Sequence, residues 1–513
     1  MPIIGNLIKR GLTFRARLGF TNAAPEIYQR EALRTLLLKA QDTAFGREYR
    51  FAELLYEQDI VAAFQNSVPT HDYQQIFDRW WHRTLGQEPN VCWNGTVKYF
   101  ALSSGTAGAA SKYIPVTEDM TKSMQRAARK MFFSLTNYDI PTKVLTKGMM
   151  MVGGSADLNE GNGYFYGDLS GINANRVPIW MRRYYKPGTQ IARIPDWDAR
   201  IATIAKNAAD WDIGFMTGIP AWVQLMMERV IEYHKVETIH DVWPNLSVYV
   251  SGGVAFEPYR RGFEQLLARP LVYMDSYLAS EGFISFQGRP QEGGAMAMQL
   301  VLNNGIFFEF VPFNDRNFDS EGNLLPNVET LTISEVEKDK DYALLLSTCA
   351  GAWRYLIGDT VRFTDTERCE IVITGRTKHF LSICGEHLSV DNMNRAIQLV
   401  SNELGITVRE FTVSAMAHKE GFFAHKWYIG SDATFNTALF TERLDEHLKA
   451  LNDDYRTERQ SVLKDLFVEA VSPKLFYEFQ AVDSKRDGQA KFPRVMKAER
   501  FKRWETFVQS HKG

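Results

Sequence analysis

The sequence predicts an α/β protein with a large N-terminal domain and a small α+β C-terminal domain. In the first part of the 513-residue chain, strand-like apolar runs alternate with amphipathic helical segments, which is typical of parallel sheets covered by helices. Between Ala295 and Asp365 strand runs follow one another without long helices, which indicates a β-rich, more antiparallel subdomain. After Gly375-Arg-Thr-Lys378 the elements become shorter. We therefore place the two domains at 1–375 and 376–513.

Local patterns predict the individual elements in chain order. The segment Ile27–Gln41 contains no proline and repeats apolar residues at helical spacing, so we expect a packed helix. Strands are expected at Val97–Leu102, Gly148–Val152, Ile213–Met216, Leu246–Val250 and Leu271–Asp275, with a helix at Ala221–His234. Beyond the boundary we expect helices at Val390–Leu404, Asn436–Leu451 and Lys497–Val508, and strands near Phe411–Ala415 and Trp427–Ile429.

Charge and hydropathy argue against several classes of function. Lys and Arg total 59 against 61 Asp and Glu, a net charge of -2, so no basic field favours nucleic acid. No run approaches the ~18 apolar residues of a membrane span, so no membrane partner is expected. Met1–Phe20 is basic, which fits an ordinary N-terminal helix better than a transit-like or membrane-surface one. The 4 cysteines are scattered without a C-x-x-C pair, which favours free thiols in a reducing cytoplasm.

One loop combines the residue types that bind phosphate. Leu102–Pro115 contains serines, a threonine, glycines and Lys112 directly after a strand-like run. Glycine lets the backbone approach an anion closely, and N–H groups and hydroxyls then donate hydrogen bonds to it. Thr117 begins the next helix as its N-cap. The spacing is not that of the Walker loop, and a surface turn has a similar composition, so the later segments must decide between the two.

Three later segments carry further polar residues beside strand-like runs. Ser276-Tyr-Leu-Ala-Ser-Glu-Gly282 follows the run that ends at Asp275. Trp353-Arg-Tyr-Leu-Ile-Gly-Asp359 is expected to precede a strand, and Ile373-Thr-Gly-Arg-Thr-Lys378 to follow one.

In this order the segments resemble the adenylate-forming superfamily, which activates carboxylic acids with ATP. The closer resemblance is to its Gretchen Hagen branch, the auxin-responsive acyl-acid amido synthetases. That branch has an SSGT loop, a Tyr-x-x-Ser-Glu segment, a Tyr-Arg-x-x-Gly-Asp segment and a C-terminal Gln-x-Lys-x-Pro-Arg, seen here as Gly488-Gln-Ala-Lys-Phe-Pro-Arg494. Two departures are that Arg354 precedes Tyr355 and that Ala490 replaces a tyrosine common in plant relatives. The resemblance extends from about the first helix to the last, and it implies a C-terminal domain that pivots near Gly375.

The resemblance assigns the catalytic groups. Ser104, Thr106 and Lys112 are expected to hold the β- and γ-phosphates and the departing pyrophosphate. Glu281 is expected to bind Mg²⁺, a hard ion that carboxylates and phosphates share, although a solvated glutamate at a strand end is the plainer alternative. Lys491 is expected to swing in and neutralise the α-phosphate, with a solvated surface lysine as the alternative.

The remaining site residues are assigned to the nucleotide and the acid. For adenine, Tyr277 is expected to pack against the ring, and the backbone of Ser251, Gly252 and Gly253 to contact its edge. Ser280 is expected to form a hydrogen bond near the phosphates. Asp359 is expected to accept hydrogen bonds from the ribose hydroxyls, and Arg376 to reach the ribose or a phosphate. Core packing for Tyr277 and turn formation for Asp359 remain alternatives. Met216 and Phe283 are expected to line an apolar pocket for the acid, or else to belong to the core.

These assignments predict a ligase that adenylates a small carboxylic acid with ATP and Mg²⁺ and joins it to an amine, in the first place an amino acid, as an amide. A coenzyme A ligase with the same first step and a non-catalytic nucleotide sensor remain the alternatives.

Overall fold

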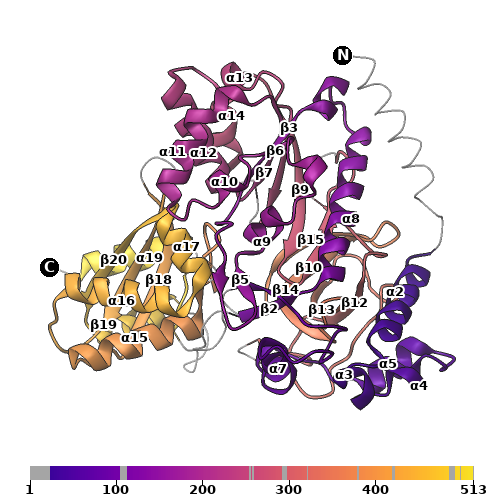
Figure 1. Ribbon diagram of the computed structural model, residues 1–513. Helices are drawn as coiled ribbons and strands as arrows, with labels where there is room; N and C mark the ends of the chain where they lie inside the picture. Colours follow the sequence, from indigo (N-terminus) through magenta and orange to yellow (C-terminus); the bar gives the residue numbers. More distant parts are fainter. Residues whose placement is uncertain are drawn as a thin grey trace. The chain divides into compact units, whose positions relative to one another are not determined.

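The computed structural model describes residues 24–103, 112–253, 256, 259–291, 297–319, 322–377, 380–386, 388–418, 422–483, 492–496 and 498–511 (Figure 1). The chain divides into two compact units. The first is Met1–Leu102 with Tyr113–Thr377, and the second is Ser103–Lys112 with Lys378–Gly513. The domain boundary expected after residue 375 therefore lies two residues before the first unit ends at Thr377. That the second domain pivots stays a prediction.

A mixed sheet is the centre of the first unit. Among the described residues it has 11 strands in the order β12-β13-β14-β15-β11-β10-β9-β8-β7-β3-β6. Their bounds are β12 Ile306–Pro312, β13 Asp341–Thr348, β14 Tyr355–Asp365, β15 Glu370–Arg376, β11 Met298–Leu300, β10 Gly282–Phe286, β9 Val272–Ala279, β8 Val248–Gly252, β7 Ile213–Gly218, β3 Gly148–Val152 and β6 Tyr185–Lys186. The strands from β9 to β6 pair in parallel, and those from β12 to β9 pair antiparallel. The expected β-rich part is thus continuous with the parallel part.

Helices cover the parallel half, as the alternating pattern predicted. They are α8 Glu118–Ser134, α9 Leu169–Asn175, α10 Thr189–Ala192, α11 Trp197–Asn207, α12 Pro220–His234, α13 Ile239–Val242 and α14 Arg260–Gln265 (Figure 1). The predicted cap of α8 is confirmed, because the Thr117 side chain accepts a hydrogen bond from the Met120 amide at 3.0 Å. Helix α12 contacts β3 and β7, and α8 contacts β10.

Short N-terminal helices pack at the antiparallel end of the sheet. They are α2 Pro25–Ala40, α3 Ala44–Glu48, α4 Phe51–Leu54, α5 Ile60–Ser67, α6 Tyr73–Ile76 and α7 His82–Leu85. Helix α2, predicted from its spacing, lies against β12, where the buried Gln29 side chain donates to the carbonyl of Leu302 at 2.7 Å and accepts from the amide of Phe308 at 2.7 Å. A smaller sheet has the order β2-β1-β5-β4, formed by β2 Lys112–Val116, β1 Tyr99–Ser103, β5 Phe165–Gly167 and β4 Asn159–Glu160.

The second unit is an α+β domain, as the sequence predicted. Its sheet has the order β18-β19-β20, with β18 Glu410–Ala417, β19 Phe423–Gly430 and β20 Leu463–Val471, and a separate pair joins β16 Phe380–Leu381 to β17 Leu388–Ser389. Its helices are α15 Val390–Leu404, α16 Thr437–Leu451, α17 Asp453–Gln460, α18 Pro473–Asp483 and α19 Ala498–Ser510. Trp504 of α19 is fully buried among aromatic rings, with Phe476 at 4.7 Å between centroids. This aromatic packing holds α19 against α18.

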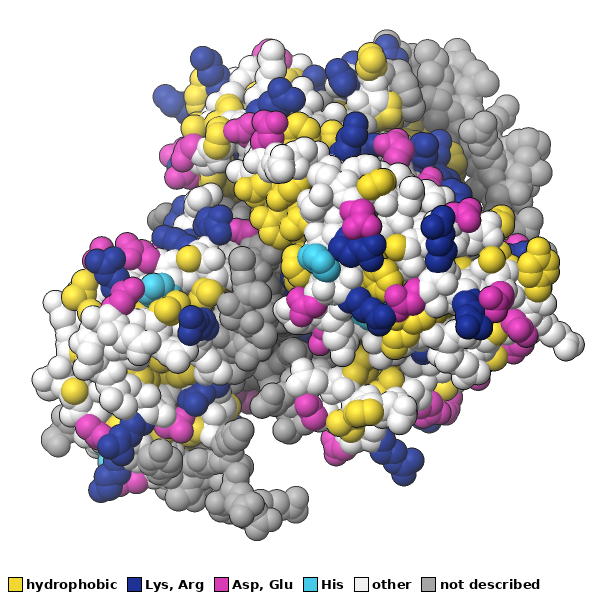
Figure 2. All heavy atoms as spheres, turned by 60° about the horizontal axis from the view of Figure 1, so that its bottom comes forward, with side chains coloured by type: hydrophobic (Ala, Val, Ile, Leu, Met, Phe, Trp, Pro, Cys, Tyr) yellow, Lys and Arg dark blue, Asp and Glu magenta, His cyan; other side chains and the backbone are white. Residues whose placement is uncertain are grey.

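The surface carries charges of both signs. Figure 2 shows lysine and arginine side chains interspersed with aspartate and glutamate over the visible face. This mixture agrees with the net charge of -2. Within the part of the chain that the structure describes, no helix has the length and apolar character that crossing a bilayer requires.

Candidate active site

The carboxyl ends of β8 and β9 form a glycine-rich sheet edge. Ser251 and Gly252 end β8, and in the parallel register they lie opposite Asp275 and Ser276 of β9. The Ser276 hydroxyl donates to the Ser251 carbonyl at 2.8 Å. A Cβ at Gly252 would lie 3.1 Å from the Ser276 hydroxyl oxygen, and Gly253 has φ +85°. Glycine at both positions therefore leaves this edge open for backbone contact with a ligand.

The segment that contains Tyr277 is a strand and a turn. We expected Ser276–Gly282 to follow a strand, and this is wrong, because β9 continues through Ala279 and pairs with β10 from Gly282. Cross-strand pairing with β10 keeps these residues extended, which the local pattern did not reveal. Ser280 and Glu281 form the connecting turn. Glu281 is only 6 % exposed, so it is not the solvated carboxylate of the plainer alternative.

Asp359 and Arg376 lie opposite each other on neighbouring strands. We expected the segment ending at Asp359 to precede a strand and the segment around Arg376 to follow one, and both expectations are wrong. Asp359 is inside β14, Arg376 ends β15, and the two residues are paired in the antiparallel register. Arg376 Nε lies 2.9 Å from Asp359 Oδ1. The Thr377 amide also donates to the carbonyl of Gly358 at 2.8 Å, which fixes the end of this strand pair.

A hydrogen bond from Tyr277 connects these two regions. The Tyr277 hydroxyl donates to Asp359 Oδ2. Burial, followed by the nearby Asp359 carboxylate, raises the pKa of Tyr277 well above its usual value of 10.0. Arg376 opposes this shift and Glu281 adds to it, so three charged groups act on the Tyr277 hydroxyl. Three strands separate β9 from β14 in the sheet, and the tertiary structure nevertheless brings their side chains together.

Tyr355 joins the same cluster and was not predicted as a site residue. It begins β14 and is fully buried, and its hydroxyl has no hydrogen-bond partner among the described residues. Burial first, and then the Glu281 carboxylate, raise the pKa of Tyr355 well above 10.0. An unpaired buried hydroxyl is costly, so this group is suited to meet a ligand atom. Its place in the Trp353–Asp359 segment was the only sequence signal for it.

The other expected residues are distributed as follows. Lys112 begins β2, whereas Ser104, Thr106 and Lys491 lie outside the described residues. Met216 in β7 is fully buried and Phe283 in β10 is 5 % exposed, with its ring 6.1 Å from that of Phe286. Both therefore pack in the core in this structure. No group of three or more His, Cys, Asp or Glu side chains that could hold a metal occurs among the described residues.

Three family descriptions match successive parts of the chain. The GH3 family N-terminal domain matches residues 17–208, the GH3 family central domain 299–376 and the GH3 family C-terminal domain 391–500. Together these ranges include more than half of the 513 residues.

Curated relatives match over part of their length. The indole-3-acetic acid-amido synthetase GH3.2 of Arabidopsis thaliana is 24 % identical over 234 residues, which are 43 % of this chain and 42 % of that protein. The jasmonoyl-L-amino acid synthetase JAR6 of Nicotiana attenuata is 24 % identical over 209 residues, 38 % of this chain and 34 % of that protein. The aligned part therefore spans less than half of either relative.

Solved structures match over almost the whole chain. The GH3.15 acyl acid amido synthetase has a TM-score of 0.58 at 17 % identity, with 98 % of this chain and 96 % of that chain covered. A 2-hydroxyisobutyryl-CoA ligase in complex with 2-HIB-AMP and CoA has a TM-score of 0.56 at 11 % identity, covering 94 % and 92 %. At these identities the likeness establishes a shared fold. From the three domain matches, in order along the chain, it follows that this protein belongs to the GH3 family.

Proposed function

We propose that this protein is an ATP-dependent ligase that joins a small carboxylic acid to an amine, in particular an amino acid, through an acyl-adenylate. The observation that carries the proposal is the cluster of Tyr277, Asp359, Arg376 and Glu281, because residues from three separate motif segments meet there. Membership of the GH3 family supports the assignment, as do the names of the relatives, which are amido synthetases.

The proposed reaction has two steps. A substrate carboxylate oxygen attacks the α-phosphorus of ATP, the bond to the bridging oxygen breaks, and pyrophosphate leaves. The amine nitrogen then attacks the acyl carbon, AMP leaves, and the nitrogen loses a proton to give the amide. Negative charge builds up around the phosphorus in the first step, so the site must supply cations and hydrogen-bond donors there. Lys112 and Lys491 are the proposed cations, with Ser104 and Thr106 as hydroxyl donors.

The described residues suit a bound nucleotide. The Asp359 carboxylate can accept hydrogen bonds from ribose hydroxyls, and Arg376, with Nε at 2.9 Å from Oδ1, keeps that carboxylate in place. The backbone of Gly252 and Gly253 is suited to the edge of a base, whereas the carbonyl of the buried Ser251 already accepts from Ser276. Because the Tyr277 hydroxyl is committed to Asp359, we propose that it positions this carboxylate, and that any adenine contact involves its ring.

The buried Glu281 carboxylate fits a Mg²⁺ ion that is shared with substrate phosphates. Protein Mg²⁺ sites in nucleotide enzymes commonly use one or two carboxylates together with phosphate oxygens, so a cluster of three acidic side chains is not required. When bound, the ion would neutralise phosphate charge and polarise the oxygen–phosphorus bonds. Glu281 at 6 % exposure is shielded from bulk water, which strengthens such an interaction.

The test is exchange of labelled pyrophosphate into ATP across a panel of carboxylic acids. We expect exchange that depends on the acid and on Mg²⁺. Lys491→Ala should abolish exchange but retain amide formation from a supplied acyl-adenylate. The reason is that negative charge builds up at the α-phosphate during adenylation, which precedes amide formation. Lys474→Ala is the matched control, since Lys474 is an exposed lysine of α18 paired with Glu478 at 3.1 Å.

The possible outcomes separate the alternatives. ATP binding without exchange for any acid would refute catalysis and favour a nucleotide sensor. Exchange followed by thioester formation with coenzyme A, with every amino acid inert, would refute the amide step and leave the adenylation step standing.

A further inference from the structure

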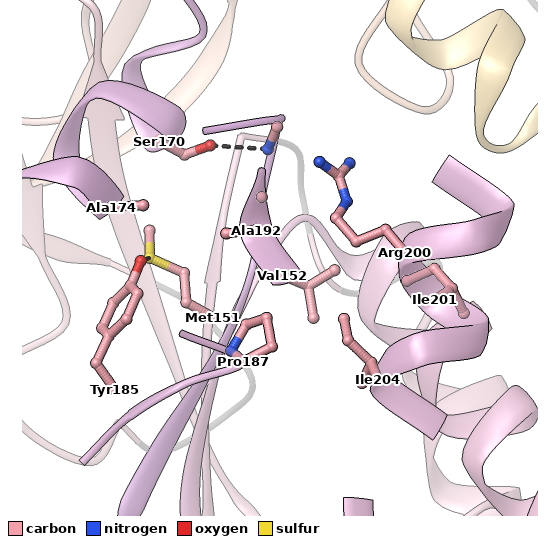
Figure 3. Close-up of a pocket in the computed structure, with 12 residues that line it drawn as sticks. Met151, Val152, Ser170, Ala174, Tyr185, Pro187, Ala192, Arg200, Ile201 and Ile204 are labelled. Atoms are coloured by element: carbon pink, nitrogen blue, oxygen red, sulfur yellow. Dashed lines mark hydrogen bonds between the residues drawn. The ribbon is translucent and has the colours of Figure 1, made fainter. Parts of the chain in front are cut away.

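A pocket opens beside the end of β3, away from the cluster around Asp359. Its cavity volume is ≈ 20 Å³, and it is lined by the end of β3, α9, β6 and its following turn, α10 and α11 (Figure 3). Most of its wall is apolar, for example Val152, Ala174, Ile201 and Ile204. Arg200 is the charged residue in this wall. We refer to the cavity as the Arg200 pocket.

Arg200 is a buried cation for which the described part of the chain offers no ion-pair partner. Its side chain is 6 % exposed, and no Asp or Glu oxygen among the described residues lies within the 4.0 Å of an ion pair. It makes one long hydrogen bond, from Nη1 to the Ile194 carbonyl at 3.4 Å, and its guanidinium lies 5.2 Å from the centre of the Trp197 ring. A guanidinium carries five N–H donors, so most of its hydrogen-bonding capacity is unused. Figure 3 shows the side chain extending from α11 toward the side of the pocket that Ser170 lines.

The two carboxylates whose charges act on Arg200 are Asp168 and Asp196, and one oxygen of each caps a helix. Asp168 Oδ1 accepts from the Ser170 amide at 2.6 Å and from its hydroxyl, which caps α9, and Asp196 Oδ1 accepts from the Ala199 amide at 2.7 Å, which caps α11. Burial lowers the pKa of Arg200, and the two carboxylates oppose this shift only in part. A buried guanidinium in an apolar wall is costly unless an anion meets it.

The Arg200 pocket and the proposed nucleotide edge belong to the same edge of the sheet. Val152 at the end of β3 pairs in register with Gly218 of β7, and Gly218 pairs with Ser251 of β8. Strands in a sheet lie about 4.8 Å apart, so the ends of β3 and β8 are separated by about 10 Å. A small molecule can therefore react near β8 and place a second polar end in the Arg200 pocket.

We propose that the Arg200 pocket binds a carboxylate of a small organic anion. Within the reaction of the proposed function, on which this step rests, that carboxylate is either the second acid group of a dicarboxylic substrate or the α-carboxylate of the amino acid acceptor. The planar guanidinium binds either one through two parallel N–H···O bonds, and the apolar wall packs against the carbon chain.

The first experiment measures binding, so it does not depend on turnover. Calorimetric titrations of the full-length protein would compare glutarate with pentanoate, and a panel of amino acids with the corresponding amines that lack the α-carboxylate. In at least one of these pairs, we expect the probe with the additional carboxylate to bind more tightly than the probe that lacks it. Arg200→Gln should weaken that binding by roughly 10- to 100-fold, the usual effect of losing a hydrogen bond to a charged group. Arg200→Lys, which keeps the charge without the fork, should have an intermediate effect.

Arg193→Gln is the matched control, because Arg193 is an exposed arginine at the end of α10 that bonds to Asn175 Oδ1 at 3.1 Å. Thermal midpoints of all variants identify any that fail to fold, and Arg200→Lys then provides the comparison. Wild-type affinity in a folded Arg200 variant, or no preference of the wild type for any carboxylate-bearing probe, would overturn the proposal.

Kinetics then identify the source of the carboxylate. If Arg200→Gln raises the KM for the acid in pyrophosphate exchange, the pocket binds a dicarboxylic substrate, because that step needs no amine. A raised KM for the amino acid alone, in amide formation, assigns it to the acceptor. Absence of exchange in the wild type would refute the proposed function but leave the binding result to be judged on its own.

Discussion

Arg354 is expected to stabilise the fold without contacting substrate, although it lies in a segment that resembles a nucleotide-binding motif. Its side chain is 6 % exposed and that of its partner Glu309 is 1 % exposed. Arg354 Nε lies 3.1 Å from both Glu309 carboxylate oxygens, Nη1 donates to the carbonyls of Gln65 and Val68 at 2.7 Å each, and Nη2 donates to the Thr330 hydroxyl at 2.8 Å. One guanidinium thus attaches the end of α5 to β12 and to the start of β14.

The perturbation is Arg354→Met, which keeps an unbranched chain and removes the charge. It leaves the Glu309 carboxylate buried and unpaired, which typically costs about 3–5 kcal/mol in the free energy of unfolding. The two carbonyls that lose a donor add to this cost, by up to about 1–3 kcal/mol each if water cannot reach them. Domains are commonly stable by only about 5–15 kcal/mol, so the loss is a large share of the total.

A double-mutant cycle isolates the ion pair. Glu309→Gln alone, Arg354→Met alone and both together would be compared by urea unfolding, followed by tryptophan fluorescence and circular dichroism. We expect the double variant to be clearly more stable than the sum of the single effects predicts, because it contains no unpaired buried charge. The remaining loss measures the bonds to the carbonyls of Gln65 and Val68 and to the Thr330 hydroxyl. Additive effects would refute the buried pair, and lost exchange activity at unchanged stability would refute the structural role.

Three further perturbations test other parts of the protein. Asp359→Asn should raise the KM for ATP in pyrophosphate exchange by roughly 10- to 100-fold, since a charged acceptor is lost, and an unchanged KM would contradict the ribose assignment. Burial alone would raise the pKa of Glu386, but the hydrogen bond from His425 and nearby amides lower it from 4.5 to about 2. The stability that the Glu386 carboxylate contributes is therefore complete above about pH 4.5 and is lost as the pH falls toward 2. Glu386→Gln should make the thermal midpoint less dependent on pH across that window. An unaltered pH dependence would contradict the stabilising pair of Glu386 and His425. Gly218→Ala should lower the thermal midpoint, with a cost of about 1–3 kcal/mol, because φ is +151° and a Cβ would lie 2.4 Å from the Val152 carbonyl oxygen; a wild-type midpoint would disprove this strain.

The sequence by itself determined the elements whose signals are local. The range Val390–Leu404 was predicted for what is α15, and Gly148–Val152 for what is β3, since each pattern lies within one continuous segment. The hydroxyl of Thr117 caps α8 as expected, because a cap needs only the next three residues. The alternation of runs also indicated the parallel half of the sheet, and the ordered motifs indicated the family.

The tertiary structure decided which distant residues meet. The segments around Tyr277 and Asp359 proved to be strands, because pairing with neighbouring strands keeps them extended. These two residues are 82 positions apart, on strands that are not neighbours, and still share a hydrogen bond. The burial of Arg200 likewise depends on several segments that close around one cavity. Local pattern cannot encode such contacts, because they depend on how the twisted sheet brings distant strands together and on which charges its packing removes from water.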